Sequence, residues 1–342
     1  MGFKNIVRLA TVFSIVLLTS TVYATPNGSI IAWGLNESGQ CIVPEPNTGF
    51  TAIAAAGWFS LGLKTNGSIV AWGCNGDGQC TLPLPNADFI GIAAGNEHSL
   101  GLKADGSIVA WGSNWYGECN VPTPNTGFMA IAGGAIHSLG LKTDGSIVAW
   151  GDNWYGQCTV PSPNTAFTAI AAGNSHSLGL KSDGSISAWG KNDYGQCNVP
   201  EPNTGFKAVA AGGYHSLGLK QDGSIVAWGC NTDGQCNVPS PNTGFTAIAA
   251  GLYHSLGLRA DSSIAAWGYN YWGQCTVPSP NTGFTAIEAG AYHSLGLKGC
   301  LYNLAGDLND DCKVDMLDFA ITANNWLVDC YATPSHPACV PK

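Results

Sequence analysis

Residues 167–200 read FTAIAAGNSHSLGLKSDGSISAWGKNDYGQCNVP, and this stretch decides the fold. Short apolar runs alternate in it with glycine, asparagine and aspartate, a pattern typical of β-strands joined by tight turns. Asp183-Gly184 separates the second and third runs, and Asp-Gly is a strong hairpin signal because both residues tolerate a positive φ. In the second run Gly179 is expected to leave room for the repeated tryptophan. Four strands are predicted: Phe167–Ala172, His176–Lys181, Ser185–Trp189, and Cys197–Val199 or its predecessor Cys158–Val160.

The unit recurs every 39 residues, with tryptophan at positions 33, 72, 111, 150, 189, 228 and 267. Seven four-stranded units of this length predict a β-propeller, while a solenoid with atypical capping repeats is the alternative. The array begins with a third strand at Gly28 and stops after a second strand at Lys298. Joining the two ends completes the seventh blade and closes the ring. The sequence therefore predicts an all-β, seven-bladed propeller over residues 25–299.

The composition agrees with many short buried strands and excludes several other classes. Of 342 residues, 46 are glycine, 45% are hydrophobic and 10% are charged. This combination excludes a disordered chain, and the lack of a Gly-X-Y triplet excludes collagen. The net charge of −9 argues against nucleic-acid binding, which needs a basic surface.

Residues 1–24 are similar to a secretory signal peptide. Lys4 and Arg8 form a basic start, Leu9–Leu18 is largely apolar, and Val22-Tyr23-Ala24 supplies small residues before a cleavage point. An uncleaved anchor is the alternative, but the apolar stretch is shorter than the roughly 20 residues of a membrane span. We expect a secreted chain, extracellular or at the cell surface, with no membrane segment after cleavage.

The consensus of the copies, AAGxxHSLGLKxDGSIVAWGxNxxGQCxVP, resembles the repeat of the regulator of chromosome condensation family. The resemblance covers residues 28–299 and implies a seven-bladed propeller. The spacing of Trp-Gly and Gly-Gln-x-x-Val-Pro is most similar to the bacterial branch that contains secreted β-lactamase inhibitory proteins. That branch implies ring closure by both chain ends, and a partner engaged by aromatic and acidic loops of one face.

Residues that recur in every copy are interpreted as scaffold. Histidine opens the second strand of six copies, and Phe59 replaces it in the first, so buried hydrogen bonds are expected here rather than a metal ring. The adjacent serines do not make a catalytic pair, since strand neighbours point to opposite faces. A basic residue that ends each second strand is expected to neutralise the nearby hairpin aspartates: Lys64, Lys103, Lys142, Lys181, Lys220, Arg259 and Lys298.

Cysteine also recurs once per copy, at positions 41, 80, 119, 158, 197, 236 and 275, and a buried, inert thiol is expected there. Cys74 and Cys230 lie six residues before Cys80 and Cys236, a spacing that favours two local disulfides after export. With 13 cysteines, at least one lacks an intramolecular partner.

The loops after the first and third strands vary among copies and are predicted to emerge at one end of the ring. They are rich in Trp, Tyr and acidic residues, which is typical of recognition surfaces, although such rings could also simply cover the blades. The candidate partner-binding residues are Trp58, Trp115, Tyr116, Trp154, Tyr155, Tyr194, Tyr214, Tyr253, Tyr271, Trp272, Tyr292, Asp152 and Asp193. Tyr269, Glu37, Asp77, Glu97, Glu118 and Asp233 lie in the same loops.

The tail, residues 300–342, contains the sequence GDLNDDCKVDMLD, which is typical of an EF-hand-like calcium loop. The predicted Ca²⁺ ligands are side-chain oxygens of Asp307, Asn309, Asp311, Asp315 and Asp318 and the carbonyl of Lys313. A helix is expected after the loop, at Phe319–Leu327. The segment resembles a dockerin with one loop in place of two, which implies docking to a cohesin-like domain. Four tail cysteines allow three disulfide pairings: Cys300, Cys312, Cys330 and Cys339.

These observations predict a secreted, non-catalytic propeller that binds an extracellular protein through one aromatic and acidic face and carries a calcium-binding tail. The alternative is a glycan-binding accessory module of an extracellular polysaccharide-degrading system, because stacked aromatic rings beside carboxylates also suit sugars. Catalysis is not expected, since no unique base, nucleophile and acid can be placed.

Overall fold

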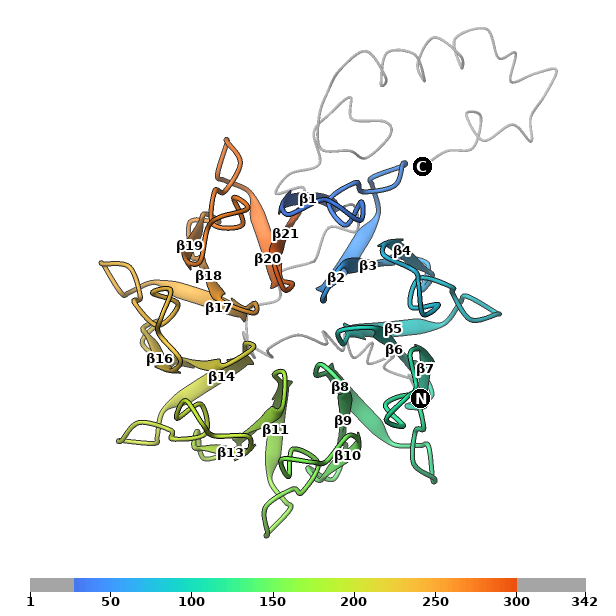
Figure 1. The fold of residues 1–342 in the computed structure, drawn as a ribbon, viewed down its shortest axis with the longest axis horizontal. Coiled ribbons are helices and arrows are strands. Elements are labelled where there is room, and N and C mark those ends of the chain that lie inside the picture. The colour runs from blue at the N-terminus through green and yellow to red at the C-terminus, as the bar shows by residue number, and fades with distance from the viewer. Residues whose placement is uncertain (1–27, 300–342) are drawn as a thin grey trace, which may run out of the picture.

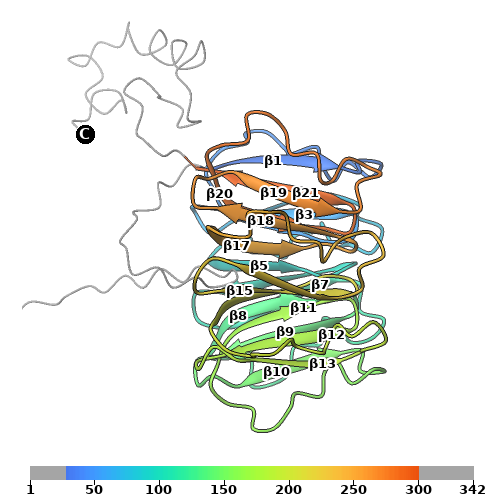
Figure 2. The same ribbon diagram turned by 90° about the vertical axis from the view of Figure 1, so that its left-hand side faces the viewer.

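The computed structural model describes residues 28–299, which form a ring of seven antiparallel sheets (Figure 1). Each sheet is a blade of three strands, and in the six blades that are continuous in the chain the first strand lies nearest the centre of the ring. The strands run along the ring axis, so their loops gather at two opposite faces (Figure 2). Six blades are continuous in the chain: β2 (Phe50–Ala55), β3 (Phe59–Lys64) and β4 (Ile69–Gly73); β5 (Phe89–Ala94), β6 (His98–Lys103) and β7 (Ile108–Gly112); β8 (Phe128–Gly133), β9 (His137–Lys142) and β10 (Ile147–Gly151); β11 (Phe167–Ala172), β12 (His176–Lys181) and β13 (Ile186–Gly190); β14 (Phe206–Ala211), β15 (His215–Lys220) and β16 (Ile225–Gly229); β17 (Phe245–Ala250), β18 (His254–Arg259) and β19 (Ile264–Gly268).

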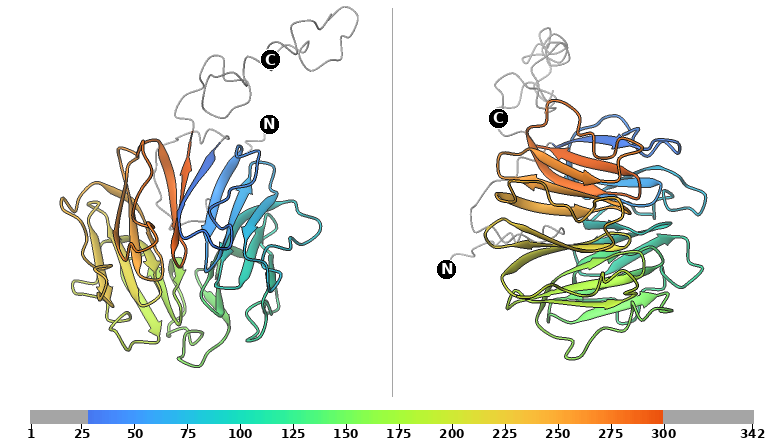
Figure 3. Two further views of the ribbon diagram at one scale, coloured as in Figure 1. Left: turned by 45° about the horizontal axis from the view of Figure 1, so that its top comes forward. Right: turned by 60° about the vertical axis from the view of Figure 1, so that its left-hand side comes forward.

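The seventh blade joins both ends of the described chain, which confirms the predicted ring closure. β1 (Ser29–Gly34) pairs antiparallel with β21 (His293–Lys298), and β21 also pairs with β20 (Phe284–Ala289). Figure 3 shows the blue and red ends of the described chain side by side in this blade. Residues 28–299 contain no helix that could span a membrane.

The predicted fourth strand is wrong, because the Cys-x-Val segment satisfies its amides within its own loop. The N–H of Cys158 donates to Oδ1 of Asn153 at 2.8 Å, and the N–H of Val160 donates to the carbonyl of Cys158 at 3.2 Å. The chain beyond it is held to the blade by Asn164, whose side chain bonds both the N–H and the carbonyl of Ile147 at 2.8 Å. This amide side chain covers the start of the outer strand where a fourth strand was expected.

The predicted hairpins between second and third strands are present, but with a different turn. Gly184 has φ 79° and donates its N–H to the carbonyl of Lys181, whose own N–H bonds the carbonyl of Ser185. The turn ends in a β-bulge whose residue, Gly184, is in the left-handed conformation. Asp183 does not have a positive φ. Ser262 takes the glycine position in one copy, with φ 66°.

Glycine in the second strand makes room for phenylalanine, so the expectation that it accommodates tryptophan is wrong. A Cβ added to Gly179 would lie 2.6 Å from the ring of Phe167 and 3.2 Å from Ile147 of the preceding blade. Phe167 is 3% exposed and belongs to a core of Leu, Ile, Phe and Trp side chains between neighbouring blades. The glycine therefore allows adjacent blades to pack closely.

The basic residues that end the second strands lie near the hairpin aspartates, as expected, but form no ion pair with them within residues 28–299. Bonds from Ser107 lower the pKa of Asp105, and the nearby Lys103 adds to this effect. Lys64 Nζ lies 3.7 Å from the ring centre of Phe50, and its six equivalents stack on the corresponding phenylalanines. The hairpin carboxylates accept local bonds instead, as Asp105 does from the N–H and Oγ of Ser107 at 2.9 and 2.6 Å. The basic side chains are thus held in cation–π contact with the phenylalanine rings and not by ion pairs.

One backbone carbonyl ties each blade to the next. The carbonyl of Gln157, in the loop after β10, accepts bonds from Trp189 Nε1 at 2.8 Å and Ser177 Oγ at 2.9 Å in the following blade. His137 Nε2 then contacts the same Ser177 Oγ at 3.0 Å. The Trp and Ser bonds recur at all seven blade interfaces, including the closing one, where Trp33 and Ser294 share the carbonyl of Gln274.

The histidine contacts confirm the predicted structural role. Each serine donates its proton to a carbonyl, so the histidine must be the donor to the hydroxyl, with its proton on Nε2. Nδ1 of all six histidines is buried without a hydrogen-bond partner, and burial lowers their pKa to about 3 or 4. They are therefore neutral in the fold at neutral pH. Phe59 interrupts the ring of contacts, and Ser99 across that interface bonds only the carbonyl of Gln79.

Replacing His176 with phenylalanine, the residue of the first copy, is expected to lower the free energy of unfolding by about 1 kcal/mol at pH 7. The loss is small because Ser216 keeps its bond to the carbonyl of Gln196. Equilibrium urea denaturation measures it, with Ser187→Ala on a half-exposed strand position as the control variant. An unchanged or increased stability would contradict the bridging role.

The six histidines also predict acid sensitivity. An unfolded histidine has a pKa of about 6.5, so between about pH 6.5 and pH 4 the unfolded chain binds protons that the folded chain excludes. Stability is therefore expected to fall in this window, by up to about 1.4 kcal/mol per pH unit for each histidine. Urea denaturation from pH 7.5 to 4.5 tests this, and His176→Phe should give a shallower slope. A flat profile for both chains would show that the histidines are not held neutral.

Candidate interaction face and central channel

The loops after the first and third strands meet at one face of the ring, as predicted. The N–H of Cys74, after β4, donates to the carbonyl of Trp58, after β2, at 2.9 Å. Likewise the N–H of Leu35, after β1, donates to the carbonyl of Tyr292, after β20, at 2.9 Å. The nearly invariant Pro-x-Pro-Asn loops lie at the opposite face, where Asn86 bonds Ile69 at the start of β4. We call the face with the variable loops the loop face.

Aromatic side chains of the loop face form a continuous line of ring contacts, here named the aromatic chain. Tyr269 is at its centre, with ring centres 6.3 Å from Tyr253 and 6.2 Å from Tyr292. Tyr292 reaches Trp58 at 6.1 Å, and Tyr253 stacks on Tyr214 at 5.6 Å. The members of the aromatic chain are Trp58, Tyr194, Tyr214, Tyr253, Tyr269, Tyr271, Trp272 and Tyr292.

The outer members of the aromatic chain remain open to solvent. Tyr271 is 75% exposed, Tyr194 53% and Trp272 40%, and the last lies edge-on to Tyr271 with ring centres 4.8 Å apart. The inner members are half-buried, and burial together with the neighbouring Tyr214 raises the pKa of Tyr253 to about 12. Tyr253 thus stays neutral, and the packed inner rings contact the exposed ones.

Four of the predicted aromatic residues are not part of this chain. Trp115 and Trp154 are each 85% exposed, and their neighbours Tyr116 and Tyr155 are 57% and 46% exposed. Lys191 lies 4.6 Å above the ring of Tyr155. The loop face therefore carries one contiguous aromatic chain and two separate Trp-Tyr pairs.

The acidic residues of these loops differ in their bonding partners and in their exposure. Asp152 accepts a bond from Gln157 Nε2 at 2.6 Å, and Asp193 forms an ion pair with Lys191 at 3.3 Å. Glu118 is buried, contrary to the expectation of an exposed acid, because it replaces a loop glutamine and accepts bonds from Ser113 Oγ and the N–H of Tyr116. The exposed carboxylates are those of Glu37, Asp77, Glu97, Asp193 and Asp233.

Tyr269 was not among the predicted contact residues, although the structure makes it the centre of the aromatic chain. It directly follows Trp267-Gly268, at a position that holds Leu, Cys, Ser, Asp or Lys in other copies. This variation among the copies was the sequence signal that could have identified Tyr269 as a contact residue. Its contacts with Tyr292 of the next blade depend on which blades are neighbours, so the loop sequence alone does not reveal them.

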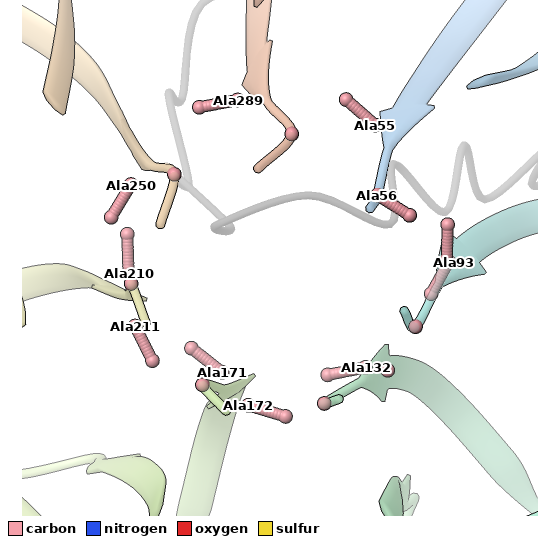
Figure 4. Close-up of a pocket in the computed structure, with 18 of the residues that line it drawn as sticks. Ala55, Ala56, Ala93, Ala132, Ala171, Ala172, Ala210, Ala211, Ala250 and Ala289 are labelled. Carbon is pink, nitrogen blue, oxygen red and sulfur yellow. The ribbon is translucent and has the colours of Figure 1, made fainter. Parts of the chain in front are cut away.

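A central channel of about 480 Å³ runs between the inner strands β2, β5, β8, β11, β14, β17 and β20. Figure 4 shows alanines from these strands around it, among them Ala55, Ala93 and Ala250. Glu288 of β20 is the one charged residue that lines the channel within the described part of the chain, and sequence reasoning missed it. Burial raises the pKa of its carboxyl to about 8.

The nine cysteines between residues 28 and 299 are unpaired thiols, so the predicted Cys74–Cys80 and Cys230–Cys236 disulfides are not formed. Cys80 Sγ turns toward its own loop and donates to the carbonyl of Cys74 at 3.2 Å. Burial raises the pKa of the once-per-copy thiols to about 11 or 12, which fits the expected inert role.

The described residues contain no group of three or more His, Cys, Asp or Glu side chains placed to hold a metal ion. The predicted calcium ligands, Asp307 to Asp318, and the helix and cysteines of the tail lie outside residues 28–299. The predicted signal peptide, residues 1–24, lies outside them as well.

Comparisons with known proteins agree with the architecture. The model of the "Regulator of chromosome condensation (RCC1) repeat" matches residues 50–79, 89–118, 130–157, 167–196, 206–235 and 245–274. A comparison with curated protein sequences finds no significant match.

Solved propellers resemble the whole ring. Prp20p from Saccharomyces cerevisiae, described with its binding properties to Gsp1p and histones, aligns with TM-score 0.70 at 17% identity, over 88% of this chain and 96% of that one. Human WBSCR16 aligns with TM-score 0.64 at 18% identity, over 80% and 100%. The ectodomain of the Arabidopsis thaliana receptor kinase ACR4 aligns with TM-score 0.59 at 25% identity, over 73% and 91%.

The six matched segments cover more than half of the chain, and each contains the second strand, the third strand and the Gly-Gln or Gly-Glu loop of one blade. The chain therefore belongs to the regulator of chromosome condensation repeat family.

Proposed function

We propose that this chain is a secreted, non-catalytic propeller that binds an extracellular protein through the loop face. The aromatic chain carries the proposal, because its exposed rings are held by packed tyrosines before any partner arrives. Rigid Tyr and Trp side chains lose little entropy on binding and dominate the energy of many protein interfaces. The open carboxylates nearby favour a partner with a basic surface.

Two further observations support a binding role, and a third supports export. Family members are typically protein-binding modules, and the yeast relative is described by its binding to other proteins. The Ser and His side chains that contact each other are completely buried between blades, as with His176 and Ser216, so a substrate does not reach them. The ten-residue apolar stretch Leu9–Leu18 follows the basic residues Lys4 and Arg8, and this order supports export.

A glycan is the second candidate ligand, and one observation favours it. Trp115 and Trp154 are 85% exposed, each beside a tyrosine, and open indole rings are suited to stacking on sugars. This hypothesis uses the two Trp-Tyr pairs, whereas protein binding uses the aromatic chain. Variants of the Trp-Tyr pairs and of the aromatic chain can therefore distinguish glycan binding from protein binding.

A photo-reactive benzoylphenylalanine at position 271 is expected to cross-link the partner in the organism's extracellular fraction. The same residue at position 84 is the matched control, because Leu84 is 92% exposed on the opposite face. Trp272→Ala should weaken capture of the cross-linked protein at least tenfold, while Trp154→Ala leaves it unchanged.

Equal cross-linking from positions 271 and 84 would contradict the loop face as the binding site. Retained glycan-array binding by Trp272→Ala, lost in Trp115→Ala and Trp154→Ala, would instead support the glycan hypothesis.

We also propose that the tail binds one Ca²⁺ and attaches the chain to a cohesin-like domain. The support is the spacing of oxygen donors at positions 1, 3, 5, 9 and 12 of the loop, since a hard cation needs several such ligands. The single loop and Cys312 at the turn position depart from the usual dockerin pattern.

Calorimetric titration of the full chain with Ca²⁺ is expected to show one site, lost in Asp307→Ala and in Asp318→Ala. Asp310→Ala is the matched control, because Asp310 stands at position 4, which supplies no ligand. Binding that survives Asp307→Ala, or is lost equally in Asp310→Ala, would contradict this assignment.

A further inference from the structure

Glu288 breaks the sevenfold pattern of the central channel. The equivalent position of the other six blades is alanine: Ala54, Ala93, Ala132, Ala171, Ala210 and Ala249. All seven positions line the channel. Six copies show that a methyl group fits this wall, so packing alone does not require the longer, charged side chain of Glu288.

The carboxyl of Glu288 has no counter-ion within the described residues. β20 packs against β17, β18, β21 and β2. β17 and β2 carry no titratable side chain. In β18 and β21, His254 and His293 bond serines of the next blades, and Arg259 and Lys298 lie over phenylalanine rings. The remaining titratable groups of the channel lining are the phenols of Tyr214 and Tyr292.

Placing a carboxyl in such a site costs free energy unless a partner compensates it. Burial alone raises its pKa to about 8, so the group is mostly protonated at neutral pH when the channel holds no cation. An ammonium beside it would favour the ionised form, and the attraction is strong because the surrounding walls are apolar.

The route to Glu288 starts at the loop face. Glu288 is the second-last residue of β20, and the loop that follows β20 carries Tyr292. Trp58, Tyr214 and Tyr292 line the channel and also belong to the aromatic chain. Aromatic faces attract cations, so these rings favour entry of a positively charged group from the bound partner.

We propose that the central channel receives a lysine side chain of the bound protein, whose ammonium pairs with Glu288. This rests on the proposed function of the loop face. The four-carbon stem of lysine suits walls of alanine, and its compact ammonium needs only one carboxylate, whereas the planar arginine head requires a wider, forked site.

The test uses n-pentylammonium as a probe of the lysine side chain and the full-length chain as the protein. Amide NMR shifts of β2, β17 and β20 should report saturable binding that is at least tenfold weaker in Glu288→Gln and Glu288→Ala. 1-Pentanol is the matched neutral probe and should bind all three chains equally weakly. Glu288→Ala should fold normally, because it restores the alanine of the other six blades. Equal ammonium affinity in all three chains would overturn the proposal.

A carbon-13 titration of the six glutamates gives an independent readout. The signal absent in Glu288→Gln should titrate near pH 8 in the wild-type chain and at lower pH with the probe present. No change in that signal with saturating probe would overturn the pairing.

Two outcomes separate this proposal from the proposed function. In the first, partner capture depends on Trp272 but is unchanged in Glu288→Ala or when the lysines of the partner are acetylated. This result would overturn the channel site and leave the loop face as the binding site. Glu288-dependent ammonium binding without partner cross-linking at position 271 would overturn the protein lysine as occupant and favour a free amine.

Discussion

The ring depends on one shared acceptor, the backbone carbonyl of the Gly-Gln loop. At each interface this carbonyl accepts the indole N–H of a tryptophan and the hydroxyl proton of a serine from the next blade, as Gln157 does from Trp189 and Ser177. A histidine of the blade that contributes the carbonyl donates to that hydroxyl at six of the seven interfaces. Because these groups are buried, an indole N–H that lost this carbonyl would be left unsatisfied.

This network explains why some positions repeat and others vary. The Trp and Ser side chains bond between blades, so the copies retain them. Glutamine recurs for a local reason, because its Oε1 accepts the N–H two residues earlier, as Gln157 does from Tyr155, and Glu118 accepts the equivalent bond from Tyr116. Side chains that extend beyond the network at the loop face are free of this constraint. The aromatic chain lies at such positions, and Glu288 lines the channel outside the network; both break the sevenfold symmetry of the ring.

Much of the fold could be predicted from sequence because its signals are local and repeated seven times. The spacing of tryptophan and the hairpin glycines predicts the blades, and the unmatched ends predict closure by β1 and β21. The fourth strand could not be excluded, since Cys158–Val160 has strand-like residues, and only the bond from Cys158 to Asn153 shows that its amides are used within the loop. For the site, the sequence indicates the right face but not that Tyr269 joins Tyr253 of its own blade to Tyr292, because the contact with Tyr292 is made between neighbouring blades. Glu288 stands where the other six copies have alanine, and that difference was the available signal. A glutamate in a strand usually faces solvent, and only the closed ring places this one in the channel.

Hydrogen exchange of the chain, free and bound to its extracellular partner, shows which face the partner covers. We expect slower exchange on binding in the loops that carry Trp58, Tyr214, Tyr253, Tyr269–Trp272 and Tyr292, with the Pro-x-Pro-Asn loops unchanged. Slower exchange confined to the Pro-x-Pro-Asn loops, or spread evenly around both faces, would contradict a binding site built on the aromatic chain.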